Sequence, residues 1–396
     1  MVGYDSFCTL FLDILLPDIH ISQICGQYYL RKGGDSLEQF SCKTRIISGA
    51  GAVNHLKQFG FRRLLMVTDP FFYKNGTAQR IAGAAGSEAV EYFHKVVPDP
   101  SATLAAEGTA ALQAFDPDAV VALGGGSAMD CAKAMVYFSG TKATLVAIPT
   151  TSGSGSEVTD FAILTHDGVK HPLVDPRLKP DVAILDEELL TRLPPSLIAD
   201  GGYDALTHAL EAYTAKNAGA ITDALALRAF RDTFRLLSRS FGGDLTARPG
   251  VHMAATMAGM AFTQAGLGLC HALAHSLGGQ FHIPHGRLNA ILLPAVICRN
   301  ASAAGERYAE LARAIGLEGR AVSVGVRNLR SALIRLRREV GLPATLAQAG
   351  ISPVQIRQKA DSIVKAALAD PCCATNPLPV TESMVRDILS EVTGYA

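Results

Sequence analysis

The sequence lacks a surplus of charge, a C-x-x-C motif and a long apolar run, and each absence excludes a class of protein. Its 36 basic and 36 acidic residues leave no positive excess to neutralise nucleic-acid phosphates. The eight cysteines are scattered, which favours buried thiols in a reducing compartment over a disulfide framework. No apolar run reaches the ~18–20 residues of a membrane helix, and no Lys or Arg precedes Arg31 to start a secretory signal. We therefore expect a cytoplasmic protein that binds neither nucleic acid nor membrane.

What the chain does contain is 48% hydrophobic residues, arranged in two different patterns. Residues 1–40 resemble neither pattern, and we treat them as an extension of uncertain structure. From 41 to 193, apolar runs of about five residues end in turn residues and alternate with helical stretches, which is typical of buried parallel strands. These runs lie at 44–48, 64–68, 119–123, 145–149 and 181–185.

The strand signals stop near residue 193, and residues 194–396 have helical periodicity. We expect helices over 200–237, 249–264, 269–280, 303–315, 322–340, 353–369 and 381–393. The sequence therefore predicts an N-terminal α/β domain with a parallel sheet, followed by an all-α domain.

Two loops at strand ends are suited to a dinucleotide. The run at 119–123 ends in Gly124-Gly125-Gly126-Ser127, and a helical stretch begins directly after it. Glycines let the backbone approach a phosphate, and the free N–H groups at a helix start favour an anion. A tight strand-to-helix turn would explain the same residues. After the next strand, Thr150–Glu157 offers hydroxyls and small residues at the same end of the sheet, which favours a ligand site over a flexible loop.

Asp69 follows the run at 64–68. A carboxylate there can accept both hydroxyls of the adenosine ribose and repel the 2′-phosphate of NADP, so it favours NAD. A plain turn aspartate before Pro70 is an equally good interpretation of this residue by itself.

Five candidate metal ligands lie in the helical half. Asp204 and His208 are four residues apart in a helical stretch, so both side chains project from one face. His271 and His275 repeat the spacing on a later helix, and His285 follows in a turn. A lone histidine is usually structural, but two such pairs and a third histidine indicate a divalent metal site. Carboxylate and imidazole ligands suit Fe(II), Zn or a neighbouring metal without choosing among them. We interpret His252 and His282 as non-ligands.

Five stretches carry specific motifs. They are GGGSAMDCAKA (124–134), AIPTTSGSGSEVT (147–159), PDVAILD (180–186), GYDALTHALEAY (202–213) and AGLGLCHALAHSLGGQFHIPHG (265–286). With these motifs the chain resembles the iron-dependent (group III) alcohol dehydrogenases over roughly 42–395. The resemblance implies a dehydroquinate synthase-like fold with an NAD-binding α/β domain at 41–193 and an all-α metal-binding domain at 194–396. It is strongest to the 1-propanol dehydrogenases of propanediol-utilising microcompartments, which implies a microcompartment association.

The resemblance also assigns roles to residues. The metal, Fe(II) or alternatively Zn, would be held by Asp204, His208, His271 and His285, with His275 near the nicotinamide. The residues implied in cofactor binding are Asp69, Gly125, Gly126, Ser127, Thr150, Thr151, Ser154, Thr159 and Lys170. Phe262 and Cys372 would line the substrate pocket. Four positions depart from the family pattern: Ser154 replaces Thr, Tyr203 replaces Met, Asp99 replaces an Asn near the cofactor, and Leu378 stands where an Arg usually follows the proline.

We expect an NAD-dependent enzyme that interconverts a short-chain primary alcohol and its aldehyde, with 1-propanol and propanal as the expected pair. The metal would polarise the substrate oxygen, and His275 would relay the proton because imidazole titrates near neutrality. A homodimer or larger homo-oligomer is expected.

A lyase resembling dehydroquinate synthase is one alternative function. It would need several Arg or Lys beside a phosphorylated acid, and the helical motifs are apolar apart from the ligands. A non-catalytic scaffolding partner is another, and the intact ligand set argues against it.

Overall fold

The computed structural model describes residues 39–166 and 169–394. The chain divides into two compact units. The α/β unit contains Cys42–Thr150 and Ser156–Leu189, and the helical unit contains residues 39–41, Thr151–Gly155 and the chain from Leu190. The change of unit after Leu189 lies close to the predicted boundary at 193. The loop Thr151–Gly155, which we expected in the first domain, clusters instead with the helical residues. The expectation for residues 1–40 falls outside the described residues, except for 39 and 40.

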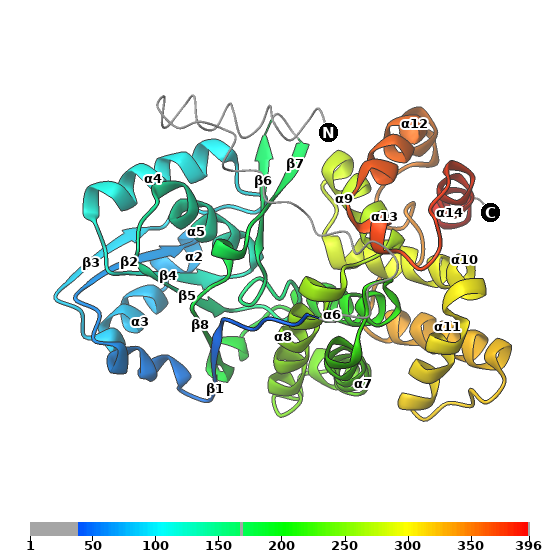
Figure 1. Cartoon of the computed structure of the whole chain (residues 1–396), viewed down its shortest axis with the longest axis horizontal. Helices are drawn as coiled ribbons and strands as arrows, with labels where there is room; N and C mark the ends of the chain where they lie inside the picture. The colour runs from blue at the N-terminus through cyan, green and yellow to red at the C-terminus, as the bar shows by residue number, and fades with distance from the viewer. Residues whose placement is uncertain (1–38, 167–168, 395–396) are drawn as a thin grey trace. The chain divides into compact units, whose positions relative to one another are not determined.

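The α/β unit is built on a six-stranded parallel sheet with the order β1-β8-β5-β4-β2-β3 (Figure 1). Its strands are β1 (Arg45–Gly49), β2 (Arg63–Thr68), β3 (Ala89–Phe93), β4 (Ala119–Gly124), β5 (Thr144–Pro149) and β8 (Val182–Asp186). The helical elements of this unit are η2 (Ala52–Phe59), α2 (Pro70–Lys74), α3 (Thr77–Ala85), α4 (Ala102–Phe115), α5 (Gly126–Ser139), η3 (Pro176–Leu178) and η4 (Glu187–Leu190). A separate antiparallel hairpin joins β6 (Phe161–His166) to β7 (Val169–Val174).

Both faces of the parallel sheet are buried because alternate strand residues enter two different apolar clusters. Leu64 and Met66 of β2 pack in one cluster with Ile81 of α3. Leu65 and Val67 pack in the other with Met129 of α5. Helices on both faces are the usual reason why parallel strands read as continuous apolar runs. The predicted α/β class is therefore confirmed.

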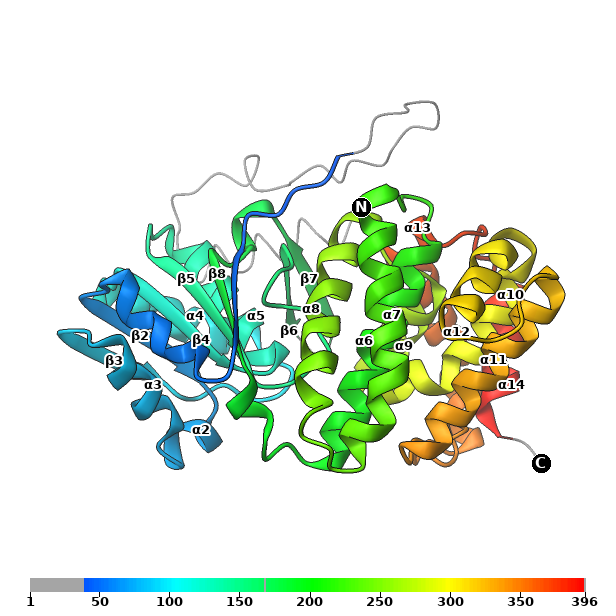
Figure 2. The ribbon, with the colours of Figure 1, turned by 90° about the horizontal axis from the view of Figure 1, so that it is seen from below.

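The helical unit contains only helices in its described residues. They are α6 (Pro195–Thr214), α7 (Ala220–Phe241), α8 (Arg248–Ala265), α9 (Leu269–Phe281), α10 (His285–Ala314), α11 (Val322–Glu339), α12 (Pro353–Ala369), α13 (Cys372–Thr375) and α14 (Glu382–Thr393). Helices α6, α7 and α8 pack side by side (Figure 2), and α10 packs against α6, α9 and α11. The prediction of a single helix over 200–237 is wrong, because α6 ends at Thr214 and α7 begins at Ala220.

Helix α10 continues through a proline. It runs for 30 residues with Pro294 inside it, although a proline cannot donate to the carbonyl four residues earlier. That carbonyl, on Ala290, instead accepts a hydrogen bond of 3.2 Å from Nη1 of Arg337 on α11. Arg330, on the same helix, donates to the carbonyl of Pro294 at 3.2 Å. The neighbouring helix thus satisfies the acceptor that the proline leaves open.

Helix α10 is also the one helix in the described residues that is long and apolar enough to cross a membrane by composition. In its most apolar window 72% of the residues are buried inside the protein, as in the core helix of a helical domain. It therefore gives only weak support to a membrane span.

Two glycines allow close approaches to α6, one to its backbone and one to a side chain. An ideal Cβ on Gly286, at the start of α10, would lie 1.8 Å from the carbonyl oxygen of Asp200 on α6. An ideal Cβ on Gly268, just before α9, would lie 2.8 Å from a carboxylate oxygen of Glu211. At Gly286 only glycine leaves room, because the neighbour is backbone, and this approach sets the start of α10 beside α6.

Candidate functional site

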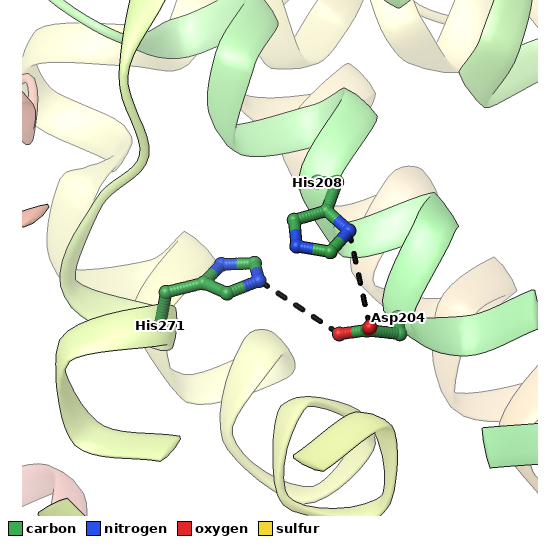
Figure 3. Close-up of side chains that lie close together, drawn as sticks. All are labelled: Asp204, His208 and His271. Carbon is green, nitrogen blue, oxygen red and sulfur yellow. Dashed lines mark ion pairs between the residues drawn. The ribbon is translucent and has the colours of Figure 1, made fainter. Parts of the chain in front are cut away.

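Two helices bring three of the predicted ligands together. Asp204 and His208 project from the same face of α6, and His271 faces them from α9 (Figure 3). Their donor atoms all lie within 4.8 Å of one another. Nδ1 of His208 is 3.9 Å from Asp204 Oδ2, and Nε2 of His271 is 3.8 Å from Asp204 Oδ1. The i, i+4 spacing on α6 thus produces the convergence that the sequence predicted.

His285 reaches the same carboxylate from α10. Its Nε2 is 3.8 Å from Asp204 Oδ1, and its ring centroid is 5.1 Å from that of His271. His285 was expected in a turn, but it is the first residue of α10. Its position follows from Gly286, which allows α10 to start against α6.

The charges around Asp204 favour cation binding. Burial opposes the charge of Asp204, but the imidazoles of His208, His285 and His271 lower its pKa below the usual value. Burial lowers the pKa of His208 to about 3 and that of His285 well below its usual value, so both rings are neutral at pH 7. The carboxylates of Asp204 and Glu211 outweigh burial at His271 and raise its pKa to about 9.

The residues fit a divalent metal on two structural observations. Nδ1 of His208 is buried and has no hydrogen-bond partner among the described residues. The three nitrogen-to-carboxylate distances of 3.8 to 3.9 Å are too long for hydrogen bonds. They are shorter than the span of about 4.2 Å that two metal bonds of about 2.1 Å can bridge. One carboxylate and three imidazoles are donors that Fe(II) and Zn both accept.

Two residues that the sequence analysis missed contact the candidate ligands. Glu211 accepts a hydrogen bond of 2.6 Å from Nδ1 of His271. Asn289 donates to Asp204 Oδ1 at 2.8 Å, and its Nδ2 lies 3.2 Å from Nε2 of His271. The rule that found the ligands could have found both residues, since Glu211 continues the Asp204 face of α6 and Asn289 lies four residues after His285.

His275 lies one helical turn after His271 on α9 and has a different partner. Its Nδ1 is 2.8 Å from Asp370 Oδ2, and its ring stacks on His285 with centroids 5.0 Å apart. The backbone N–H of Cys372 donates to the other Asp370 oxygen at 2.9 Å. The side chain of His275 is 27% exposed, so this imidazole combines an anchored Nδ1 with access to solvent.

The two predicted pocket residues lie beside two different histidines. Phe262 of α8 is 3% exposed, and its ring stacks on His208 with centroids 4.3 Å apart. The Cys372 sulfur, a nitrogen of His275 and a carboxylate oxygen of Asp370 all lie within 4.8 Å of one another. Burial and the Asp370 carboxylate raise the pKa of its thiol well above the usual value, so the thiol stays protonated.

In the α/β unit, the predicted cofactor residues follow three adjacent strands. Asp69 comes after β2, Gly125 and Ser127 after β4, and Thr150 after β5. The N–H of Thr150 donates to the Gly124 carbonyl at 2.9 Å, which joins two of these loops. Carboxyl ends of neighbouring parallel strands are the usual place for a dinucleotide.

Asp69 has two functions available to its two oxygens. Oδ1 accepts from the N–H groups of Phe71 and Phe72 at 2.8 and 3.0 Å, which caps α2. Oδ2 points toward the β4 loop, 3.8 Å from the place where a Cβ on Gly124 would be. The turn interpretation of Asp69 and the ribose interpretation are therefore compatible, because the cap uses only one oxygen.

Two of the predicted cofactor residues have their polar groups engaged within the α/β unit. Thr159 is fully buried, and its hydroxyl accepts from Nζ of Lys133 at 2.9 Å. Lys170 pairs with Asp99 at 2.6 Å. Asp99 is one of the family departures and has a positive φ of 56°. A dinucleotide that contacted Thr159 or Lys170 would have to compete with these partners.

The remaining predicted cofactor residues, Thr151 and Ser154, lie in the loop that clusters with the helical unit. In this loop, Oγ of Ser152 lies 2.9 Å from Nδ1 of His252. An ideal Cβ on Gly153 would lie 2.9 Å from the Gly201 Cα of α6. This loop is thus packed directly against the helix that carries Asp204 and His208.

Two family profiles match the chain and between them span both units. "Iron-containing alcohol dehydrogenase" matches residues 43–187, and "Fe-containing alcohol dehydrogenase family, C-terminal" matches residues 198–393. The chain belongs to the iron-containing alcohol dehydrogenase family. Membership confirms the expected enzyme class, a metal-dependent oxidoreductase acting on alcohols, and does not favour the lyase or scaffolding alternatives.

Three similar proteins illustrate the range of the family. The 1-propanol dehydrogenase PduQ of Salmonella typhimurium is 42% identical over 371 residues, which cover 90% of this chain and all of the relative. The NADPH-dependent butanol dehydrogenase of Clostridium saccharobutylicum is 37% identical, covering 88% of this chain and 96% of the relative. The structure of sulfoacetaldehyde reductase from Bifidobacterium kashiwanohense in complex with NAD+ matches with a TM-score of 0.82 and 28% identity, covering 91% and 100% of the two chains.

Proposed function

We propose that the enzyme interconverts a short-chain primary alcohol and its aldehyde with NAD(H), with 1-propanol and propanal as the substrate pair. The observation that carries the proposal is the buried group of Asp204, His208 and His271, with the partly exposed His285 beside the same carboxylate. In a member of this family, such a cluster is suited to hold Fe(II), with Zn as the alternative metal. The similarity to the Salmonella 1-propanol dehydrogenase supports the choice of substrate.

When bound, the metal supplies Lewis acidity to the substrate oxygen. When bound, NAD would supply the acceptor for the hydride that the alcohol loses on oxidation, and the hydroxyl proton would have to leave the site. His275 is the proposed acceptor of that proton. Because Asp370 holds Nδ1 of His275 at 2.8 Å, Nε2 is the nitrogen left to take up the proton and pass it to solvent. The reduction of the aldehyde reverses these transfers.

The α/β unit would bind the dinucleotide at the ends of β2, β4 and β5. The start of α5 at Gly126 offers free N–H groups to the pyrophosphate, beside Gly125 and Ser127. Oδ2 of Asp69 would accept the ribose hydroxyls and disfavour a 2′-phosphate. NAD+ in the similar sulfoacetaldehyde reductase structure supports this cofactor, whereas the NADPH-dependent butanol dehydrogenase makes Asp69 the residue to test.

Phe262 and Cys372 would limit the substrate to a short unbranched chain, because the Phe262 ring stacks on the candidate ligand His208 and the Cys372 thiol lies beside His275. We also propose that the enzyme works in the cytoplasm, as a homodimer or larger homo-oligomer, in association with a microcompartment. The six described cysteines are free thiols, which is consistent with a reducing compartment.

The test is NADH consumption with propanal by protein prepared without oxygen, with and without added Fe(II) or Zn. Metal content is measured by elemental analysis on the same samples. We expect His271→Ala and His285→Ala to lose both metal and activity while the far-ultraviolet circular dichroism stays unchanged. Full activity in protein free of metal would refute the proposed centre. A lyase would leave NADH unconsumed when the aldehyde is added.

A further inference from the structure

Glu211 is a buried carboxylate at the start of α9. It is 4% exposed, and it lies on α6, three residues after the candidate ligand His208. Its Oε2 accepts from Nδ1 of His271 at 2.6 Å and from the N–H of Gly268 at 3.0 Å. Its Oε1 accepts from the N–H of Cys270 at 2.8 Å. One side chain therefore contacts both a candidate ligand and the backbone of the helix that carries it.

The helical repeat places Glu211 where these contacts are made. Asp204, His208 and Glu211 are spaced i, i+4 and i+7, so all three share one face of α6. The first turn of α9 points its unpaired N–H groups at this face, and a carboxylate is the favoured partner for such groups. Helix α6 thus provides two ligands and also the group that orients a ligand on another helix.

The hydrogen bond to Nδ1 decides which nitrogen of His271 is turned to the cluster. With Nδ1–H donating to Glu211, Nε2 faces Asp204 at 3.8 Å. The local packing allows little freedom, because a Cβ on Gly268 would contact Oε1 of Glu211 at 2.8 Å. A carboxylate that holds the second nitrogen of a metal-binding histidine is a common way of fixing its orientation.

We propose that Glu211 is the positioning residue of the metal centre: it fixes the ring and the tautomer of His271 and joins them to the start of α9. This inference rests on the proposed function, because it takes His271 to be a ligand. Glu211 does not touch the metal in this proposal. Its effect on the reaction passes through the metal affinity.

The chain offers a matched control. Asn376 also caps α9, accepting from the N–H of Leu269 at 3.1 Å through Oδ1. It is buried, like Glu211, and its side chain hydrogen-bonds with Leu269, Asn300 and Leu378. Asn376→Ala therefore removes a capping hydrogen bond from the same helix end without changing the partner of His271.

The experiment titrates Co²⁺ into metal-free protein and follows the visible absorption of the bound ion, with Zn²⁺ competition to give affinities. We expect Glu211→Gln to weaken binding by about 10- to 100-fold, the usual effect of losing such a partner. Asn376→Ala should lower the thermal unfolding midpoint but bind Co²⁺ as tightly as the wild type. Glu211→Asp, which keeps the charge with a shorter reach, should fold and still bind more weakly than the wild type.

Two results would overturn the proposal. The first is wild-type Co²⁺ affinity in Glu211→Gln or, if that variant does not fold, in Glu211→Asp. The second is an equal loss of affinity in Asn376→Ala, which would assign the effect to the helix cap alone. His271→Ala separates this failure from that of the proposed function. If His271→Ala binds Co²⁺ like the wild type, the metal centre itself is refuted.

Discussion

Replacing Gly286 by alanine should open the candidate metal centre without removing any ligand. Gly286 follows His285 at the start of α10, and its missing side chain lets this helix touch the backbone of α6. An added Cβ would lie 1.8 Å from the carbonyl oxygen of Asp200 and 3.0 Å from the Cβ of Asp204. The first of these neighbours is backbone, so the clash cannot be relieved by turning a side chain.

The size of the displacement follows from these distances. The Cβ must move from 1.8 Å to an ordinary contact of at least 3.4 Å, so the start of α10 and α6 must separate by more than 1 Å. Nε2 of His285 and Oδ1 of Asp204 are already 3.8 Å apart. Since two metal bonds span only about 4.2 Å between donors, that movement takes the pair out of range. We expect at least a tenfold loss of Co²⁺ affinity and a free energy of unfolding lower by about 1–3 kcal/mol.

The assay is Co²⁺ titration together with urea unfolding, and Gly279→Ala is the control. Gly279 lies inside α9, and an added Cβ there meets nothing within 4 Å. Alanine at that position should leave the metal affinity unchanged and stabilise the helix by about 1 kcal/mol. If Gly286→Ala binds Co²⁺ as tightly as the wild type, the close contact between α10 and α6 does not set the geometry of the centre.

Three further predictions concern the cofactor, the pocket and acid stability. Asp69→Ser keeps a cap for α2 but removes the negative charge. The ratio of kcat/KM for NADPH to kcat/KM for NADH should therefore rise about tenfold, as expected for one carboxylate near a phosphate. An unchanged ratio would show that Asp69 serves only as a cap. For wild-type enzyme, kcat/KM should peak at aldehydes of three or four carbons, since each buried methylene contributes ~0.8 kcal/mol until the chain meets Phe262. Phe262→Ala should move this optimum to longer or branched aldehydes. Because the ring packs on His208, the change should also lower the free energy of unfolding by about 3–5 kcal/mol. Identical chain-length profiles for the wild type and the variant would contradict the pocket assignment. Burial opposes the charge of Asp370, but His275 lowers the pKa of this carboxyl to about 2. The ionised carboxylate therefore stabilises the folded protein by about 2 kcal/mol above pH 4, and this stabilisation is lost as the pH falls toward 2. The stability difference between wild type and Asp370→Asn should shrink over that range in denaturant titrations, and a constant difference would exclude this ionisation.

The sequence predicted the four inner strands β2, β4, β5 and β8, which are continuous apolar runs because they are buried on both faces, and it also predicted the edge strand β1. It did not predict β3, whose segment Ala89–Phe93 lies at the sheet edge and has only one fully buried residue. The β6–β7 hairpin was also missed, since it lies outside the parallel sheet and contains His and Lys residues. β3 and the hairpin strands are half exposed and lack a continuous apolar run, so their pattern does not stand out from that of loops.

The helix over 303–315 was predicted too short for a specific reason. The first half of α10 contains Pro294, and a proline inside a helical pattern normally marks its end. What allows the helix to continue is a hydrogen bond from Arg337, more than 40 residues later in the chain. Contacts of this kind are tertiary and cannot be read from local periodicity.

The candidate site shows the same limit. Helical spacing grouped Asp204 with His208 and His271 with His275, but spacing alone could not separate the two histidines of α9. The structure does so through their partners, because His271 is held by Glu211 beside Asp204 and His275 by Asp370. Neither carboxylate was identified from the sequence. Glu211 continues the Asp204 face of α6, so helical spacing could have found it. Asp370 follows the end of α12 and is 95 residues from His275 in the chain, so no local spacing relates these two.

The hydrogen bond between Arg337 and the Ala290 carbonyl has an evolutionary consequence. A substitution of Pro294 by a residue with an N–H would restore the helical hydrogen bond to Ala290 and leave Arg337 with a competitor for that carbonyl. A substitution of Arg337 while Pro294 is kept would instead leave a buried acceptor unpaired, which costs about 1–3 kcal/mol. The two positions should therefore change in a fixed order in this family. Pro294 can be substituted first, and only then can Arg337 be substituted without leaving the Ala290 carbonyl unpaired.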